Sequence, residues 1–541
     1  MATPTKTDKP TPMKSLPAAL AEAAATHSTA PALLGSSGTH TFASLAEASR
    51  AFASALATLG VNKGTHVGIL LPNQPSWLVT AWAVWRLGGT IVPLNTLWTA
   101  PELQAALDWA DVHLLVAIPR FLKHDYVAAL RSFGVEPHRR QTRASTLPCL
   151  HTVVWTDPDG SVQGRCESAS TLTAGAPSPD WLAAQEHAVE ATDVAAIFFT
   201  SGSEGTPKAV VHTHRSILAA AQGISERLGL GPPDRVWAYL PWFFAGGLVA
   251  GVLAPWLVGA GVIYQPTFDP GEAIALMERF QATTFFAWPH QAQAIVNHPA
   301  FSRQRLRLHK GPGAQAGWAK ALYGEDHTAV SSWGMTETGP MAATTAWSDP
   351  LERRCSTHGR PLPGVEMRVV DPTTGANLPA GREGELLVRG TTVMASYYKK
   401  RARDCFDTDG FFHTGDRAFL DSDGYLHFLG RLRDVIKVAG ANVSPAEVEQ
   451  VLHAYPGVRS AAIVGIPHPE RGETIVAFLV PKPEQHLDQD QLGAFCRQHL
   501  AAYKVPRHFF ILTPEEWPEL GSGKVDKSAL RQRARRLLGL V

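Results

Sequence analysis

The sequence predicts an α/β protein with a large domain built around parallel strands and a second, smaller domain. Two observations predict this class. Apolar, strand-like runs alternate with segments that are apolar on one helical face, which is the pattern of strands joined by helices. The length of 541 residues also exceeds what one hydrophobic core usually serves. We therefore expect at least two domains.

The first part of the chain shows this alternation most clearly. Residues 42–60 are apolar on one helical face, residues 66–73 predict a strand that ends in a turn, and residues 75–89 are helical again. The run AAIFF at residues 195–199 predicts a further buried strand. Residues 134–192 are largely polar, so we interpret them as a surface insertion.

After about residue 370, short strands with turn signals dominate, as in GELLVRG and GYLHFLG. The stretches DTDG at 407–410 and DSDG at 421–424 resemble the start of a calcium loop. Leu426 stands where the second of them would need a glycine, so both are interpreted as hairpin turns.

The pattern returns to mixed helices and strands of small-domain size near Arg431. We predict one domain over residues 15–430 and a second over residues 431–541. Residues 1–14 are rich in Pro, Thr and Lys and have no apolar run, which predicts a disordered leader.

The overall composition argues against several classes of protein. A formal net charge of +1 and a pI near 7.8 give no electrostatic case for binding nucleic acid. The five cysteines are scattered, which indicates a reducing compartment and neither a disulfide framework nor a zinc site. We expect a cytoplasmic monomer or homodimer.

One uncharged stretch, residues 236–268, is long enough to cross a bilayer. Its prolines and glycines divide it into shorter pieces. A buried strand, a core helix and a second strand explain it equally well, and this interpretation is favoured over a membrane span.

The stretch TSGSEGTPKAVV at residues 200–211 predicts a phosphate-binding loop. Glycines let backbone N–H groups approach phosphate oxygens, hydroxyls donate hydrogen bonds, and a lysine supplies charge. It is not a Walker A loop, because Pro207 precedes Lys208 and a strand-like run follows. The candidate ligands are Thr200, Ser201, Gly202, Ser203, Gly205, Thr206 and Lys208. An ordinary Gly/Ser hairpin is the alternative.

Later stretches carry polar residues that a core does not need. SSWGMTETG places Thr336 and Glu337 shortly after Trp333. Thr336 offers a hydroxyl to phosphate, Glu337 offers a carboxylate to Mg²⁺, and Trp333 offers a ring that stacks on a base. FFHTGD places Asp416 at a strand end, where a carboxylate can accept both hydroxyls of a ribose. Caps of a helix and a turn are the simpler interpretations of Glu337 and Asp416.

Two basic stretches follow. GRLRDVIKVAG offers Arg431 and Lys437 at the expected domain junction. ELGSGKVDK places Lys524 after a Gly-Ser-Gly turn, where a lysine has no packing role.

In this order, these stretches resemble the adenylate-forming superfamily of acyl-CoA synthetases, peptide-synthetase adenylation domains and luciferases. The resemblance runs from about Leu16 to Leu530 and includes LPNQPSWLVTAWAVWRLGGTIVPLN, TAPEL and YKVPRHFFI. It implies a large N-terminal domain of parallel-sheet α/β layers plus a distorted β-barrel, and a small mobile α+β C-terminal domain.

The resemblance also implies a two-step reaction. A carboxylate attacks the α-phosphate of ATP in the presence of Mg²⁺, pyrophosphate leaves, and the acyl adenylate then passes its acyl group to a thiol, most often that of CoA. The implied partners are therefore a small carboxylic acid, ATP and CoA.

Roles for individual residues follow from the same resemblance. They are phosphate binding by residues 200–208, adenine contact by Gly313, Ala314 and Trp333, α-phosphate contact by Thr336, Mg²⁺ binding by Glu337, ribose and phosphate binding by Asp416 and Arg431, and the thiol step near Lys437. Lys524 would bridge the carboxylate and the α-phosphate, where a fixed cation stabilises developing charge. Arg433 matches the hinge about which the small domain rotates.

Some positions depart from the family pattern. Phe244 stands where fatty-acyl and coumarate-type members usually have His, although LPWFFAGGL resembles benzoate-type CoA ligases. Pro312 and Gln315 replace the more usual Gly and Pro beside adenine. The expected acyl wall comprises Trp242, Phe243, Phe244, Gly246, Trp288 and His290. This aromatic surface favours an aromatic or medium-sized acid over a long chain, and a plain aromatic core is the alternative.

The acceptor is expected to come from outside the chain. CoA is the first expectation, a separate carrier protein or an amine is the second, and an atypical small substrate is the third. A catalytically inactive homologue that only binds ligands would need to keep none of the charged candidate residues, so we expect an enzyme.

Overall fold

The structure is a computed structural model that describes residues 14–136, 144–156, 177–200, 208–432, 436–438, 441–468, 472–500, 502–520 and 524–540. It contains two compact units. The first comprises Met1–Glu366 and Arg389–Phe406, and the second comprises Met367–Val388 and Asp407–Val541. The domain boundary at residue 431 stays a prediction. The predicted leader lies outside the described residues except for Lys14, which forms an ion pair with Glu22.

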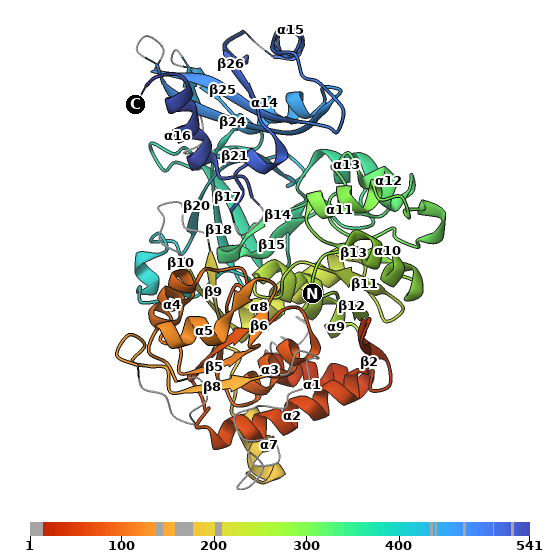
Figure 1. Cartoon of the computed structure of the whole chain (residues 1–541), viewed down its shortest axis with the longest axis vertical. Helices are drawn as coiled ribbons and strands as arrows, with labels where there is room; N and C mark the ends of the chain where they lie inside the picture. The colour runs from red at the N-terminus through yellow and green to blue at the C-terminus, as the bar shows by residue number, and fades with distance from the viewer. Residues whose placement is uncertain are drawn as a thin grey trace, which may run out of the picture. The chain divides into compact units, whose positions relative to one another are not determined.

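A seven-stranded sheet organises part of the first unit (Figure 1). Its spatial order is β19 (Ser396–Tyr397), β10 (Lys208–Thr213), β9 (Val194–Thr200), β4 (Thr90–Pro93), β3 (His66–Leu70), β5 (Leu114–Ala117) and β8 (Thr152–Trp155). The strands from β9 to β8 are parallel, and β10 and β19 are antiparallel to their neighbours. The inner parallel strands are buried on both faces, which explains their continuous apolar runs.

The helices of this region are α1 (Leu16–Thr26), α2 (Phe42–Thr58), α3 (Pro75–Arg86), α4 (Ala100–Trp109), α5 (Tyr126–Ser132), α7 (Pro179–His187) and α8 (His214–Leu228). The expected helices over 42–60 and 75–89 are confirmed as α2 and α3, which pack against each other. The expected strands over 66–73 and 195–199 are confirmed within β3 and β9.

The interpretation of residues 134–192 as a surface insertion is wrong for one segment. Thr152–Trp155 is the buried strand β8 at the edge of the seven-stranded sheet. The run TVVW is only four residues long, so its polar flanks hid it. Residues 137–143 and 157–176 lie outside the described residues.

A second sheet of the first unit has the order β13 (Thr284–Phe286), β11 (Arg235–Ala238), β12 (Gly261–Ile263), β1 (Pro31–Gly35) and β2 (Gly38–Thr41). The uncharged stretch supplies β11, the π-helix η1 (Gly246–Leu253), α9 (Ala254–Leu257) and β12. The prediction of a buried strand, a core helix and a second strand is therefore confirmed. In the described ranges, no helix is both long and apolar enough to span a membrane.

The other elements of this unit are β6 (Arg120–Phe121), β7 (His124–Asp125), α10 (Pro270–Arg279), α11 (Pro289–Val296), η2 (Arg303–Arg305), α12 (Ala319–Tyr323), β14 (Ser332–Met335), η3 (Thr336–Thr338), β15 (Gly339–Thr344), α13 (Leu351–Ser356), β16 (Arg360–Pro361) and η4 (Ala402–Asp404). Strands β14, β15 and β16 form a small antiparallel sheet.

The second unit contains two sheets. One has the order β17 (Val365–Val370), β18 (Gly384–Gly390), β20 (Phe412–Leu420) and β21 (Leu426–Arg431). The other has the order β23 (Ala441–Val443), β22 (Ile436–Val438), β25 (Gly472–Pro481) and β24 (Val458–His468), with β26 (His508–Ile511) also paired to β25. Its helices are α14 (Pro445–His453), α15 (Gln489–His499), η6 (Ala502–Lys504), η7 (Pro514–Glu516) and α16 (Lys527–Leu537).

The two aspartate-rich stretches of this unit form turns, as the sequence predicts. Asp421 Oδ1 accepts the N–H groups of Asp423 and Tyr425, which closes the hairpin between β20 and β21. Asp407 Oδ1 accepts the N–H groups of Asp409 and Phe411 in the same way.

Candidate functional site

The predicted Thr336–Glu337 pair lies in the short turn η3 between β14 and β15. Trp333 stands on β14 and is 6 % exposed. Gly339 has a φ of +79°, a left-handed conformation in which a larger side chain is strained. The turn presents a hydroxyl and a carboxylate together at the end of an antiparallel hairpin.

The Glu337 carboxylate is buried, with 5 % of the residue exposed. Tyr397 donates its hydroxyl to Glu337 Oε1 at 2.9 Å, and the Met394 N–H donates to the Glu337 carbonyl at 2.8 Å. Among the described residues, no Lys, Arg or His pairs with this carboxylate. Buried charges in proteins are usually paired or bind metals, so the site fits a divalent cation.

Mg²⁺ suits this arrangement best. The described residues contain no group of three or more His, Cys, Asp or Glu that could hold a metal alone. Mg²⁺ commonly binds through one or two carboxylates together with substrate phosphates. Glu337 is linked through Tyr397 to Lys208, at the end of the predicted phosphate loop, and this arrangement fits that combination.

His212 on β10 holds the same turn from the side of the sheet. Its Nε2 lies 2.7 Å from the Thr336 carbonyl oxygen, and its Nδ1 lies 2.9 Å from Ser216 Oγ. A carbonyl oxygen only accepts, so Nε2 carries the proton and the Ser216 hydroxyl donates to Nδ1. Burial lowers the pKa of His212 to about 4, so the ring is neutral at pH 7.

The predicted phosphate loop joins the antiparallel strands β9 and β10. Thr200 and Lys208 are opposite each other in register, and the Thr200 hydroxyl donates to the Lys208 carbonyl at 3.4 Å. Lys208 is exposed, and its Nζ lies 5.2 Å from the centre of the Tyr397 ring. Ser201, Gly202, Ser203, Gly205 and Thr206 lie outside the described residues. The two ends of the loop confirm that it connects strands.

Residues 313–314, which are expected to contact adenine, are held by the backbone of Val330. The N–H groups of Gly313 and Ala314 donate to the Val330 carbonyl at 2.9 and 3.1 Å. Gly313 has a φ of +94°, and a Cβ there would lie 2.6 Å from the Trp318 ring. Gln315 has its own role in this structure, because its Nε2 donates to the Thr357 carbonyl at 2.6 Å.

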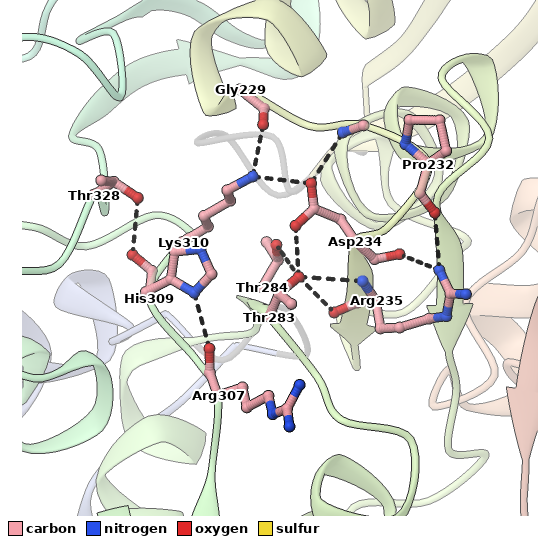
Figure 2. A network of polar contacts seen from close by, with 11 residues as sticks. Gly229, Pro232, Asp234, Arg235, Thr283, Thr284, Arg307, His309, Lys310 and Thr328 are labelled. Carbon is pink, nitrogen blue, oxygen red and sulfur yellow. Dashed lines mark hydrogen bonds and ion pairs between the residues drawn. The ribbon is translucent and has the colours of Figure 1, made fainter.

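A buried ion pair fixes the start of that segment (Figure 2). Lys310 Nζ donates to the Gly229 carbonyl at 2.7 Å and to Asp234 Oδ2 at 2.9 Å. Asp234 also accepts from the Thr283 hydroxyl at 2.7 Å and from the Gly231 N–H at 2.9 Å. The network joins the start of β11, the start of β13 and the residues that lead to Gly313, so it positions the segment that the sequence predicts to contact adenine.

Lys310→Met is expected to lower the free energy of unfolding by about 3 kcal/mol, because it leaves the buried Asp234 carboxylate without its cation. Urea unfolding followed by circular dichroism measures this loss. Lys320→Met is the matched control, since Lys320 and Glu325 form an exposed pair of little expected worth. Equal losses in the two variants would contradict the structural role of Lys310.

Asn73, at the end of β3, anchors the chain that leads to the predicted acyl wall. Its Nδ2 donates to the carbonyls of Tyr239 and Leu240 at 3.3 and 3.2 Å, and its Oδ1 accepts the Trp242 N–H at 2.9 Å. Asn73 is buried. Its three hydrogen bonds fix the irregular segment that precedes η1.

The structure divides the predicted acyl-wall residues into two groups. Trp242 is fully buried and packs its ring against Trp77 and Tyr264, as a core residue does. The remaining aromatic residues form consecutive ring contacts. Their centroid distances are 4.6 Å from Phe243 to Phe244, 6.0 Å from Phe244 to Trp288, and 5.7 Å from Trp288 to His290. This row is continuous from the buried Phe243 to the exposed His290.

Two adjacent glycines, Gly246 and Gly247, come shortly after Phe244 in the sequence. A Cβ at Gly246 would meet only Leu240 Cδ1, at 3.7 Å, whereas one at Gly247 would lie 2.1 Å from the Pro241 carbonyl oxygen. Gly247 is therefore required by the backbone, and Gly246 is a place where a larger side chain fits.

In the second unit, Asp416 and Arg431 face each other across β20 and β21. Arg431 Nε lies 2.9 Å from Asp416 Oδ1, and Arg431 Nη1 donates to the Thr414 carbonyl at 2.9 Å. Asp416 is 2 % exposed. The two predicted residues are thus brought together, and the pair across two strands replaces the simpler interpretation of Asp416 as a turn cap.

The remaining predicted residues also belong to the second unit. Lys524 is exposed, and its carbonyl accepts the Leu520 N–H at 2.7 Å. Lys437 lies on β22 opposite Asn442. Arg433, the predicted hinge, lies outside the described residues.

Four residues that position the candidate site were not predicted: Asn73, His212, Lys310 and Tyr397. Asn73 had a local signal, since it ends the stretch HVGILLPN, which predicts a strand followed by a turn. The partners of the others lie 60 to 124 residues away in the sequence, where a single sequence gives no signal.

The chain matches the model of the AMP-binding enzyme family over residues 20–398 and that of the AMP-binding enzyme C-terminal domain over residues 447–524. It is 30 % identical to the putative acyl-CoA synthetase YngI of Bacillus subtilis, with 93 % of each chain covered. It is 32 % identical to feruloyl-CoA synthase of an Amycolatopsis species, with 91 % of this chain and 94 % of the relative covered.

Solved structures show the same similarity. MatB from Rhodopseudomonas palustris with ATP bound matches with a TM-score of 0.81 and 27 % identity, over 96 % of this chain and 99 % of MatB. The anthranilate CoA ligase AuaEII in complex with anthranoyl-AMP matches with a TM-score of 0.81 and 26 % identity, over 97 % of this chain and 98 % of the ligase.

Proposed function

This chain belongs to the AMP-binding enzyme family, and on that premise we propose that it converts an aromatic or medium-sized carboxylic acid to its CoA thioester through an acyl adenylate. Its relatives are acyl-CoA synthetases and ligases, so the class is that of an AMP-forming ligase. ATP-bound MatB and the CoA ligases support ATP and CoA as substrates.

The chemistry has two balanced steps. A carboxylate oxygen of the acid attacks the α-phosphorus of ATP, the bond to the β-phosphate breaks, and pyrophosphate leaves with that electron pair. The CoA sulfur then attacks the acyl carbon, the bond to AMP breaks, and the thiol proton is released to solvent or a base. The first step is needed because a carboxylate is a poor acyl donor.

The observation that carries the proposal is the buried carboxylate of Glu337, which pairs with no Lys, Arg or His of the described residues and which Tyr397 links to Lys208 at the end of the predicted phosphate loop. Mg²⁺ bound there would neutralise phosphate charge as pyrophosphate leaves. Thr336 donates its hydroxyl to the α-phosphate, and Trp333 stacks on adenine. Lys208 and the loop that begins at Thr200 hold the outer phosphates.

The other proposed roles belong to residues of the second unit. Asp416 accepts from the ribose hydroxyls, and Arg431, held by its pair with Asp416, reaches ribose and phosphate. Lys524 stabilises the charge that develops when the acid attacks the α-phosphate. Lys437 serves the thiol step, for which Arg433 acts as the hinge.

The ring contacts from Phe243 to His290 support a flat acid. Feruloyl-CoA synthase and anthranilate CoA ligase, both named for aromatic acids, are among the similar proteins. An aromatic wall accepts a flat ring by stacking and edge contacts, and it leaves little room for an extended chain.

The test is thioester formation with CoA over a panel of benzoate-type, cinnamate-type and straight-chain acids. Turnover of an aromatic or medium-chain acid at least tenfold faster than of a long-chain acid supports the proposal. A preference for long-chain acids contradicts it. Acyl transfer to an amine or a carrier protein in place of CoA would contradict the choice of acceptor alone.

Phe244→His is expected to change the ratio of kcat/KM between aromatic and straight-chain acids by about tenfold, because it removes an edge-to-face pair worth roughly 1 kcal/mol and adds polarity. The KM for ATP should stay within about twofold. Phe280→His is the matched control. Phe280 directly follows α10, and the Arg279 guanidinium lies over its ring. An unchanged acid profile in Phe244→His would remove Phe244 from the acyl wall.

A further inference from the structure

Two adjacent tyrosines, Tyr397 at the end of β19 and Tyr398 directly after it, each donate a hydrogen bond to a different carboxylate. Tyr397 donates to Glu337 Oε1 at 2.9 Å, and Tyr398 donates to Asp111 Oδ2 at 2.8 Å. The two hydroxyls therefore have separate environments, although the two residues are adjacent in the chain.

The environment of Tyr397 is the candidate nucleotide site. β19 pairs with β10, and Tyr397 is opposite Val210 in register, two residues beyond Lys208. Lys208 Nζ lies 5.2 Å from the centre of the Tyr397 ring. One tyrosine thus contacts the phosphate-loop lysine through its ring and the Glu337 carboxylate through its hydroxyl.

Tyr398 contacts a surface ion pair, which Asp111 forms with Lys399. Asp111 also accepts from Lys399 Nζ at 3.1 Å, and the His66 ring meets the Tyr398 ring edge-on at 5.4 Å. The Asp111 carboxylate already pairs with a cation, Lys399, whereas no Lys, Arg or His of the described residues pairs with Glu337.

The kind of donor decides what the carboxylate can do. A lysine or arginine at Glu337 would neutralise the carboxylate and compete with a metal ion. A phenol hydroxyl is neutral, so it fixes the position of Oε1 while the negative charge is kept. Carboxylates that bind metals are themselves commonly oriented by such hydrogen bonds, and losing the partner typically costs tenfold or more in metal affinity.

We propose that Tyr397 is a positioning residue that orients the Glu337 carboxylate for Mg²⁺, so that the metal and the phosphate-loop lysine are aligned by one side chain. This inference rests on the proposed role of Glu337. It adds a residue that no motif of the sequence indicates.

The experiment measures binding and needs no turnover. Isothermal titration with α,β-methylene-ATP, which cannot release pyrophosphate, is carried out in EDTA and at increasing Mg²⁺. We expect Tyr397→Phe to raise the Mg²⁺ concentration needed for half-maximal enhancement of binding by about tenfold, with affinity in EDTA unchanged. Tyr398→Phe, which loses a hydroxyl from the adjacent residue, should behave like the wild type.

Each outcome decides between the two claims. An unchanged Mg²⁺ requirement in Tyr397→Phe, or an equal rise in Tyr398→Phe, overturns the role of Tyr397. Glu337→Gln separates the claims: if it keeps the wild-type Mg²⁺ enhancement, the metal assignment of Glu337 itself fails. If Glu337→Gln loses the enhancement and Tyr397→Phe does not, only the positioning inference fails.

Discussion

Lys524→Ala is expected to slow acyl-adenylate formation by about 10²- to 10⁴-fold, because one fixed cation on the transition state contributes roughly 3 to 5 kcal/mol. The Lys524 carbonyl accepts the Leu520 N–H at 2.7 Å. A single-turnover assay of pyrophosphate release measures the effect.

The same variant should still pass the acyl group to CoA when it is given a chemically prepared acyl adenylate, since the lysine serves only the first step. Lys527→Ala is the matched control. Lys527 is the first residue of α16, its Nζ lies 2.7 Å from Glu449 Oε1, and it has no proposed role in the reaction. Equal loss of both half-reactions in Lys524→Ala would show that the residue supports the fold or both steps.

Glu337→Gln is expected to reduce adenylation by about 10²- to 10³-fold, because it removes the charge that binds the metal, an electrostatic effect of roughly 3 to 4 kcal/mol. The amide keeps an oxygen that can accept from Tyr397. The free protein should at the same time become more stable by about 1 to 2 kcal/mol, since a buried charge without a cation is lost.

Unfolding in urea with EDTA present measures the stability, and ATP-dependent pyrophosphate release measures the activity. Opposite signs of the two changes are the expected signature of a metal-binding carboxylate. A variant that is both less active and less stable would mean that Glu337 serves the structure of the turn.

The sequence predicts the parts of this fold that rest on local pattern. Periodicity marks α2, α3, β3 and β9, and the uncharged stretch divides into β11, η1, α9 and β12 at its prolines and glycines. The phosphate loop and the Thr336–Glu337 turn were predicted because each concentrates its candidate functional groups within a few residues.

The parts that were missed depend on contacts between distant segments. His212 is one of many histidines until the fold brings its Nε2 to the Thr336 carbonyl, 124 residues away. Tyr397 and Tyr398 are indistinguishable in the sequence, and only the folded structure brings one to Glu337 and the other to Asp111. Trp242 appeared to belong to a pocket because aromatic residues serve pockets and cores alike.

Exchange of radiolabelled pyrophosphate into ATP, followed with and without each acid of the panel, tests the central claim most directly. We predict exchange that requires a carboxylic acid and Mg²⁺ and needs no CoA, because reversal of the first half-reaction regenerates ATP from acyl adenylate and pyrophosphate. The absence of exchange with every acid, together with no stabilisation of the protein by ATP against thermal unfolding, would contradict adenylation as the function of this chain.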